Sequence, residues 1–290
     1  MASLTTDKPV NCRDIALKCL NDLPPFSPTL NRLLATLAQE DVPFSKVGDL
    51  IEKDTVVSGN VLHLVNSALY GRRGTINSVR HAVSLLGINK LRNAVLGMSI
   101  TRMWNEVRTP LLFSMGRFNK HAAATAILAD LLAQRIQVEY PEGAFVAGLL
   151  HDVGRLLIAI ALGDQHEKIL KLRESGMPLM ECEQEILGVT HPELSAAAMQ
   201  FWNLPAPIQA AVRYHHDSAL DPARAPGVVT LSQIVEAANR YVNAIGVSIF
   251  PESAFEEEPG AAFAGLGFGE TERLIEDFKT EFEAVAQFFG

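Results

Sequence analysis

Ala147-Gly148-Leu149-Leu150-His151-Asp152-Val153-Gly154-Arg155 is the stretch from which the rest of the chain can be interpreted. An apolar helical run with small residues presents a histidine and a carboxylate side by side and then meets a glycine. Buried polar groups are costly unless they are hydrogen-bonded, ion-paired or metal-bound. Because imidazole and carboxylate together suit several divalent metals, the pair predicts a polar site whose other members come from elsewhere in the chain.

The composition predicts a folded protein with a sizeable core. The 290 residues allow one large domain or two modest ones, and 48% of them are hydrophobic. The formal net charge of -8 argues against general nucleic-acid binding, which needs a basic face. Cys12, Cys19 and Cys182 have neither CxxC nor zinc-finger spacing, which favours reduced thiols in a cytoplasmic protein. Neither a signal peptide nor a membrane-spanning length of apolar residues is visible, so no membrane association is expected.

The periodic apolar segments predict an all-α fold. Ser27-Pro28 and Ser78 are expected to begin helices, and Gly87 is expected to end one in the left-handed conformation. Thr190 and Glu193 have the spacing of a capping box, which opens a helix to about residue 202. The other helices are predicted at 14–20, 28–38, 45–51, 56–69, 78–86, 91–104, 113–136, 144–150, 156–162, 163–173, 179–187, 208–216, 228–242 and 270–289.

Two separate parts of the chain resemble the HDOD domain family. Its N-terminal signature is matched by Leu50-Ile51-Glu52-Lys53-Asp54, Leu62 to Val65, Asn66-Ser67-Ala68-Leu69-Tyr70-Gly71, Ser78-Val79-Arg80-His81-Ala82-Val83, Leu85-Leu86-Gly87 and Leu91-Arg92-Asn93. Its version of the HD phosphohydrolase core is matched by Gly148 to Arg155, Ile186 to Glu193 and Trp202-Asn203-Leu204-Pro205. The resemblance covers roughly residues 20–245. It implies a multi-helical HD-like bundle with an N-terminal helical subdomain, and a bacterial signalling or regulatory role, usually without demonstrated catalysis.

The domain organisation follows from this resemblance. An N-terminal helical subdomain is expected at 14–109 and an HD-like helical subdomain at 110–248. An acidic, glycine-rich linker is expected at 249–269, followed by a C-terminal amphipathic helix at 270–290. That helix is a candidate for docking or self-association, although packing on its own domain is the more common arrangement.

The resemblance also implies a set of metal ligands. By position, His121 matches the early ligand, His151 and Asp152 the central pair, His191 the next histidine, and His215 and His216 the late doublet. An ion held in this way lowers the pKa of a bound water and clamps phosphate oxygens. Iron, manganese, zinc and nickel are the candidate metals.

Each of these residues also has a purely structural interpretation. His121 could bond a loop carbonyl, His151 and Asp152 could brace two helices, and His191 could be an exposed helix-start residue. His215 and His216 could interact with a helix dipole. A degenerate or mononuclear metal site and a set of structural roles therefore both stay open. His63, His81 and His166 match no ligand position.

Several positions depart from the catalytic pattern. Asn239 stands at the last-ligand position, where an aspartate is expected and an amide is a poor ligand. Arg155 replaces the usual lysine after the glycine. Arg117 lies one turn before His121, where the cyclic-dinucleotide phosphodiesterase subgroup has an acidic ligand, and a cation there would repel a second metal. Asp217-Ser218-Ala219-Leu220 follows the histidine doublet, with no Gly-Tyr-Pro motif.

Two functions follow. The first is a signal-transduction module that acts by binding a signalling protein or a small nucleotide-like ligand rather than by strong catalysis, with a homodimer as one expected arrangement. The second is a metal-dependent phosphohydrolase for a nucleotide or phosphodiester, in which Asp152 and Arg155 would be the catalytic candidates. The basic residues Arg72, Arg73, Arg80, Lys90 and Arg92 are expected to form a solvated face, with contact to an acidic partner or a phosphate as the alternative.

Overall fold

The fold was analysed in a computed structural model that describes residues 11–21, 26–35, 44–66, 76–250, 263 and 265–286. Every regular element in these ranges is helical, and the only β-type pairings are the isolated bridges Val138–Val229 and Ala225–Val228. The predicted all-α class is therefore confirmed. Most of the linker predicted at 249–269 lies outside the described residues.

The helices fall close to the predicted segments. The first half contains α1 (Cys12–Lys18), η1 (Cys19–Asn21), α2 (Pro28–Ala35), α3 (Phe44–Glu52), α4 (Thr55–Val65), α5 (Val79–Leu86), α6 (Ile88–Asn105) and α7 (Met115–Ala133). The second half contains η3 (Pro141–Gly143), α8 (Ala144–Leu150), α9 (Val153–Ala161), α10 (Gly163–Glu174), α11 (Leu179–Leu187), α12 (His191–Phe201), α13 (Ala206–Arg213), η4 (Ser218–Leu220), α14 (Leu231–Ala244) and α15 (Phe268–Val285).

The predicted helix starts are confirmed by their hydrogen bonds. The hydroxyl oxygens of Ser27 and Ser78 accept backbone N–H bonds at the starts of α2 and α5. The Glu193 carboxylate accepts the Thr190 backbone N–H at 2.9 Å. The prediction for Gly87 is only half right. Its φ of 77° is positive, but its ψ of 163° lies outside the left-handed helical region, so the chain turns directly from α5 into α6.

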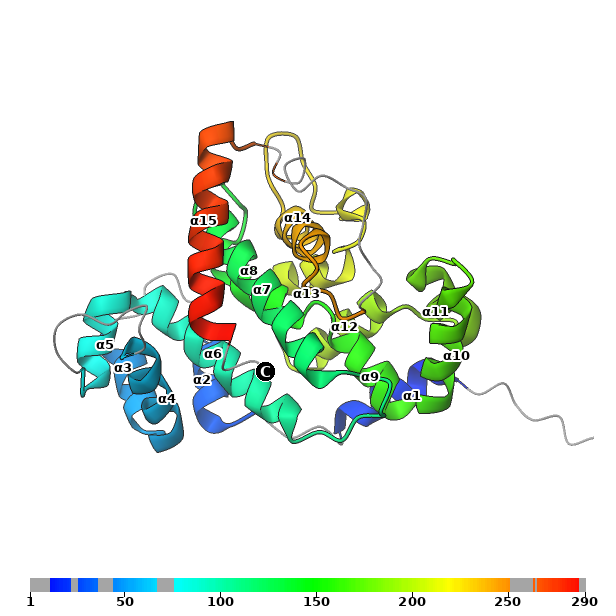
Figure 1. Ribbon diagram of the computed structural model, residues 1–290, viewed down its shortest axis with the longest axis horizontal. Coiled ribbons are helices and arrows are strands. Elements are labelled where there is room, and N and C mark those ends of the chain that lie inside the picture. The colour runs from blue at the N-terminus through cyan, green and yellow to red at the C-terminus, as the bar shows by residue number, and fades with distance from the viewer. Residues whose placement is uncertain are drawn as a thin grey trace, which may run out of the picture.

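The helices form two packed groups joined by α6. In Figure 1, α3, α4 and α5 lie at one end of the molecule and α10 and α11 at the other. Between them, α7, α8, α13 and α14 pack on one another, and α15 lies along α7. The helix α1 packs on α9 and α12 of the second group, although its sequence position falls in the predicted N-terminal subdomain.

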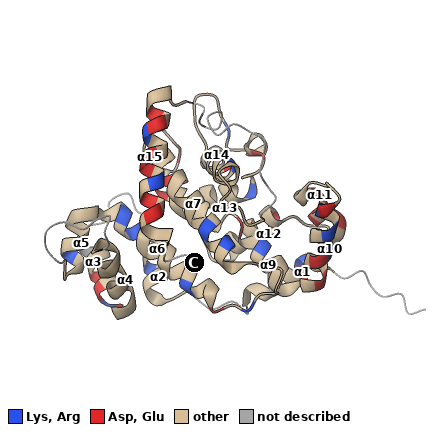
Figure 2. Cartoon of the chain, viewed as in Figure 1, with Lys and Arg blue, Asp and Glu red and all other residues tan. Residues whose placement is uncertain are grey.

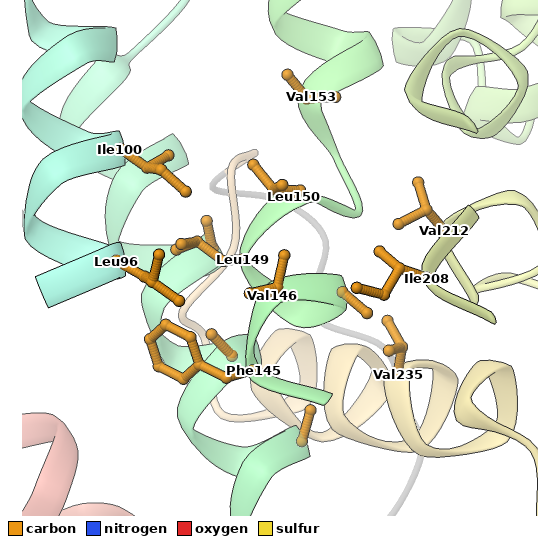
Figure 3. Close-up of a cluster of buried hydrophobic side chains, with 14 of the residues drawn as sticks. Leu96, Ile100, Phe145, Val146, Leu149, Leu150, Val153, Ile208, Val212 and Val235 are labelled. Atoms are coloured by element: carbon orange, nitrogen blue, oxygen red, sulfur yellow. The ribbon is translucent and has the colours of Figure 1, made fainter. Parts of the chain in front are cut away.

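The shared core lies around α8, whose residues are all buried. Figure 3 shows Leu96 and Ile100 of α6 beside Phe145 and Leu149, while Ile208 and Val235 lie on the opposite side. The segment 141–161 is apolar and long enough to cross a membrane by composition. Because 83% of its most apolar window is buried inside the protein, it has the character of a core helix.

The contact between α7 and α8 depends on Gly148. A Cβ atom at this position would lie 2.7 Å from the Ala126 Cα atom and 2.9 Å from the Thr125 carbonyl oxygen. These distances are too short for any side chain. Gly148 therefore lets α7, which contains His121, approach α8, which ends just before His151.

The prediction that the basic residues form a solvated face is wrong for Arg92. Arg80 is exposed and pairs with Asp49 and Glu52, and Lys90 pairs with Glu281 of α15. Arg92, however, is buried, and its Nε atom has no hydrogen-bond partner in the described part of the chain. Arg72 and Arg73 lie outside the described residues.

Candidate metal centre

Six side chains from four different parts of the chain converge in the second helix group. His121 lies in the buried face of α7, and His151 and Asp152 lie in the turn between α8 and α9. His191 is the first residue of α12. His215 and His216 follow the end of α13 at Arg213, so the helix predicted to reach residue 216 ends three residues earlier.

The ligand atoms form two groups that share the carboxylate of Asp152. One group contains His121, His151 and Asp152, and the other contains Asp152, His191, His215 and His216, with the ligand atoms of each group within 4.8 Å of one another. Asp152 Oδ2 lies 3.4 Å from His151 Nε2 and 3.6 Å from His121 Nε2. Its Oδ1 lies 3.2 Å from His191 Nε2 and 3.5 Å from His215 Nε2. Each carboxylate oxygen therefore faces a different pair of imidazoles.

Four of the histidines are oriented by a hydrogen bond at Nδ1. His121 donates to the Val247 carbonyl at 2.8 Å, His151 to the Gly148 carbonyl at 2.7 Å, and His215 to the Val212 carbonyl at 2.7 Å. A carbonyl oxygen can only accept, so each of these rings carries its proton on Nδ1. In this tautomer the neutral ring directs an unprotonated Nε2 atom at the centre. A histidine that binds a metal through Nε2 needs this tautomer.

The fourth ring, His191, is held by Glu183 of α11. The carboxylate lies 2.7 Å from His191 Nδ1 and also accepts the His191 backbone N–H at 2.7 Å. Burial disfavours the charged ring, but Glu183 and Asp152 outweigh it, so the pKa of His191 is raised. His191 is fully buried, so the interpretation as an exposed helix-start residue is wrong.

Gly154 sets the position of His191. A Cβ atom at Gly154 would lie 2.1 Å from the His191 carbonyl oxygen, and the Gly154 N–H donates to Ser195 Oγ at 2.7 Å. Since no other residue tolerates so close an approach, Gly154 allows α9 to pack against the start of α12 and bring His191 to Asp152.

Two pairs of Nε2 atoms face each other at hydrogen-bond distance. His121 Nε2 lies 3.2 Å from His151 Nε2, and His191 Nε2 lies 3.0 Å from His216 Nε2. Burial lowers the pKa of His121 to about 4 and that of His215 to about 3. Rings that stay neutral with protonated Nδ1 atoms would repel through their lone pairs at this distance. A metal ion held by these rings would remove that repulsion.

Two buried atoms of the centre have no hydrogen-bond partner among the described residues. These are Asp152 Oδ2 and His215 Nε2. Leaving such groups unpaired costs about 1–3 kcal/mol each. The donor set of imidazole nitrogens and one carboxylate oxygen fits a transition metal such as zinc, iron or nickel. The orphaned atoms and the facing nitrogens show that the residues present fit such an ion.

Arg155 sets the charge of the centre. Its Nε donates to Asp152 Oδ1 at 2.9 Å, and its Nη2 lies 3.5 Å from His216 Nε2. Burial raises the pKa of Asp152, but Arg155 and His151 outweigh it and hold this pKa well below its usual range. Asp152, Glu183 and Arg155 together carry a formal charge of about -1. This suits one divalent ion better than two, because two dications would repel strongly at short range.

The remaining candidates are not members of these two ligand groups. Asn239 is buried on α14, and its Oδ1 accepts a hydrogen bond from Asn243 at 2.7 Å. Arg117 is exposed in the first turn of α7. His63 and His81 are exposed, and His166 is buried against Phe113 with no hydrogen-bond partner for Nδ1 in the described ranges.

The sequence did not predict four partners of the centre, which are Glu183, Ser195 and the carbonyls of Gly148 and Val212. The loop carbonyl that was one alternative for His121 is that of Val247. Glu183 gives the only usable signal, because it stands between the apolar residues Cys182 and Leu187 on the buried side of α11. An acidic residue in an apolar stripe indicates a buried partner. A backbone carbonyl and a serine hydroxyl leave no such signal.

The described residues form a helical bundle with a buried cluster of histidines and one carboxylate, and comparison with known proteins identifies the family. The HDOD domain family model matches residues 23–218, so the chain belongs to the HDOD family.

Solved structures share the fold over nearly the whole chain. An HDOD domain protein of unknown function from Geobacter sulfurreducens is 25% identical, with a TM-score of 0.76 and coverage of 96% of this chain and 98% of that one. A protein from Marinobacter aquaeolei, provisionally named a signal transduction protein, is 22% identical with a TM-score of 0.72, covering 99% and 67%. A protein from Shewanella amazonensis, provisionally named a phosphohydrolase, is 22% identical with a TM-score of 0.70, covering 95% and 98%.

A curated relative from Treponema pallidum (strain Nichols) carries no functional name. It is 25% identical over 210 residues, which is 68% of this chain. The chain spans about 38% of the length of that relative.

Proposed function

We propose that this chain is a bacterial signal-transduction module built around one transition-metal ion, and that it acts by binding a partner or ligand rather than by strong catalysis. One observation supports a metal ion most strongly. Unprotonated Nε2 atoms converge on the Asp152 carboxylate, whose Oδ2 has no hydrogen-bond partner among the described residues. The ion would join α7, the α8–α9 turn, α12 and the residues after α13. Metal binding in such a site contributes to folding stability, because the unfolded chain offers no preformed site.

The ion would be held by His121, His151, Asp152, His191, His215 and His216. Four of the five rings are kept in place by a hydrogen bond at Nδ1. His216 is the exposed member of the set, so solvent and ligands would reach the centre on its side. Val247 follows α14 and accepts the His121 ring proton. Metal binding would therefore affect the position of α14 as well as that of the four segments that bear the ligands.

Two features favour a regulatory role over strong catalysis. Asn239, at the expected last-ligand position, makes its hydrogen bond to Asn243. Arg155 bonds to Asp152 Oδ1 and so weakens that oxygen as a donor to a second ion. Both features reduce the negative charge that a two-metal phosphodiesterase centre requires.

A metal-dependent phosphohydrolase is the second candidate, and one observation favours it. Asp152 directs its two oxygens to separate imidazole pairs, which is an arrangement suited to a carboxylate shared between two ligand groups. When bound, the ion would supply Lewis acidity and a water of lowered pKa. Arg155, whose side chain is 12% exposed at the edge of the centre, would orient the charge of a phosphate.

Hydrolysis assays separate the two functions. Untagged protein is incubated with a generic phosphodiester and with nucleoside triphosphates, in the presence of manganese, iron or zinc. We expect rates indistinguishable from those of His151→Ala. Robust hydrolysis by the wild type that disappears in His151→Ala would contradict the regulatory proposal and support the enzyme.

A further inference from the structure

The four residues 247–250, which follow α14 and are called the strap below, contact the histidine cluster at its edge. Gly246, with a φ of 82°, turns the chain at the end of α14, and the Val247 N–H donates to the Val242 carbonyl at 3.1 Å. The Val247 carbonyl accepts the His121 Nδ1–H at 2.8 Å. Among the described residues, this is the one hydrogen bond that joins the strap to a helix other than α14. The position of the strap is therefore tied to a candidate metal ligand.

Phe250, the last residue of the strap, lies against two guanidinium groups. Its ring centre is 4.5 Å from Arg173 Cζ and 5.6 Å from Arg155 Cζ. Figure 2 shows both basic and acidic residues on α10, and Arg173 is one of the basic residues in its last turn. Guanidinium groups within about 6 Å of an aromatic ring are attracted to its face. The half-buried ring of Phe250 therefore joins α9 to α10 beside the centre.

Arg155 connects the Phe250 ring to the exposed side of the centre. Its Nε bonds to Asp152 Oδ1, and its Nη2 lies 3.5 Å from His216 Nε2. His216 is the exposed member of the two ligand groups, so solvent reaches the cluster on this side. Because Phe250 packs on the guanidinium that stands there, the strap covers the cluster where it is otherwise most open.

Phe250 also covers Glu183, the carboxylate that orients His191. Both side chains line a hollow of about 10 Å³, together with Arg155, His166 and apolar residues of α9, α10 and α11. This volume holds one water at most. His191 is the first residue of α12, so its N–H has no partner within that helix and depends on the Glu183 carboxylate at 2.7 Å. The strap therefore keeps bulk water from the bond that positions His191.

We propose that the strap closes the histidine cluster on its Arg155 side and must open before a metal ion enters or leaves. This inference rests on the proposed function, in which the cluster holds one ion. An ion on His121 Nε2 draws charge from the ring and strengthens its Nδ1–H as a donor to the Val247 carbonyl. A metal-loaded centre therefore holds the strap closed, and opening of the strap sets the rate at which the ion is released.

The rate of zinc release tests this closure. Zinc-loaded protein is mixed with a chromophoric chelator, at concentrations where the release rate no longer increases with chelator. Phe250→Leu removes the ring but keeps an apolar side chain. Two cation–π contacts of the strength usual at exposed sites correspond to about a 5- to 30-fold change in the opening equilibrium of the strap. We expect zinc release to be faster by this factor.

Two further variants serve as controls for the release rate. Phe250→Tyr keeps the aromatic ring and should release zinc at the wild-type rate. Phe268→Leu makes the same change as Phe250→Leu at a residue of α15 that is 82% exposed, and should also behave as the wild type. Equal release rates in Phe250→Leu and Phe268→Leu, within about twofold, would overturn the proposal.

A second measurement needs no metal, and it separates the strap from the proposed function. NMR follows hydrogen exchange of the His191 backbone N–H in metal-free protein. We expect exchange about 5- to 30-fold faster in Phe250→Leu and unchanged in Phe268→Leu. Faster exchange in a protein that binds no zinc would support closure by the strap and contradict only the proposed metal function. Unchanged exchange in Phe250→Leu would overturn closure by the strap, whether or not the protein binds metal.

Discussion

Replacing Glu183 by Gln tests how the protein prepares His191 as a metal ligand. The carboxylate presents one oxygen at 2.9 Å and the other at 2.7 Å from His191 Nδ1, and the nearer oxygen also accepts the backbone N–H. Gln has only one accepting oxygen. If that oxygen keeps the backbone bond, the amide NH₂ lies against the Nδ1 proton. The ring then favours the tautomer with its proton on Nε2, which cannot bind a metal.

The expected effect is a 10- to 100-fold loss of zinc affinity, the usual range for a residue that orients a metal ligand. This corresponds to about 1.4–2.7 kcal/mol at 1.36 kcal/mol per tenfold. Affinity is measured by competition with a chromophoric chelator of known zinc affinity. Glu185→Gln is the matched control, because it makes the same change at an exposed position of the same helix.

Wild-type affinity in Glu185→Gln together with the predicted loss in Glu183→Gln would support the account. Equal affinities for the two variants, within about twofold, would refute it, because the reasoning gives Glu185 no contact with the centre. A loss of folding in Glu183→Gln is checked separately by circular dichroism in the absence of metal.

Three further substitutions test the packing of two glycines and one buried charge. Gly154→Ala places a methyl group 2.1 Å from the His191 carbonyl oxygen, so we expect a loss of about 1–3 kcal/mol in chemical denaturation and weaker zinc binding. Gly59→Ala, with nothing within 4 Å in the middle of α4, should instead stabilise by about 0.5–1 kcal/mol. Burial raises the pKa of Asp130 to about 6, so the folded state binds its proton more tightly and stability falls as pH rises from about 4 to 6. Asp130→Asn should therefore raise the free energy of unfolding at pH 7.5, by at most about 3 kcal/mol at 1.36 kcal/mol per pKa unit, and the gain should vanish near pH 4. A constant difference across this range would contradict the assignment of the charge to Asp130.

The local starts of helices could be predicted because their signals are local. Ser78 and the Thr190–Glu193 pair satisfy backbone N–H groups only three residues away. Asn66 acts in a similar way at the end of α4, because its amide donates to the Leu62 carbonyl four residues earlier. Such bonds depend on spacing along the chain, which the sequence displays directly.

The metal centre could be predicted only as a set of residues. The resemblance supplied the six positions that the fold brings together, but their spacing alone did not. Three of the rings are fixed by the carbonyls of Gly148, Val212 and Val247, which any residue type would provide. The position of His215 and His216 beyond α13 was also missed, because the His215 ring bonds the Val212 carbonyl at the end of the helix.

The roles of Gly148 and Gly154 could be predicted neither from local spacing nor from the family resemblance. The sequence marks Gly148 and Gly154 as small, but only the packing shows that each faces a backbone at less than 3 Å. The requirement for glycine comes from a tertiary contact with α7 in one case and with the start of α12 in the other. A single sequence contains no information about which helix will lie there.

Elemental analysis of untagged protein tests the central claim most directly. Protein purified without a His-tag or chelator, and the His151→Ala variant purified in parallel, are analysed for iron, manganese, zinc and nickel. The account predicts about one transition-metal ion per wild-type chain and a large loss of it in His151→Ala. Wild-type protein that contains no such metal, and that shows no rise in Tm when each of the four is added, would contradict it.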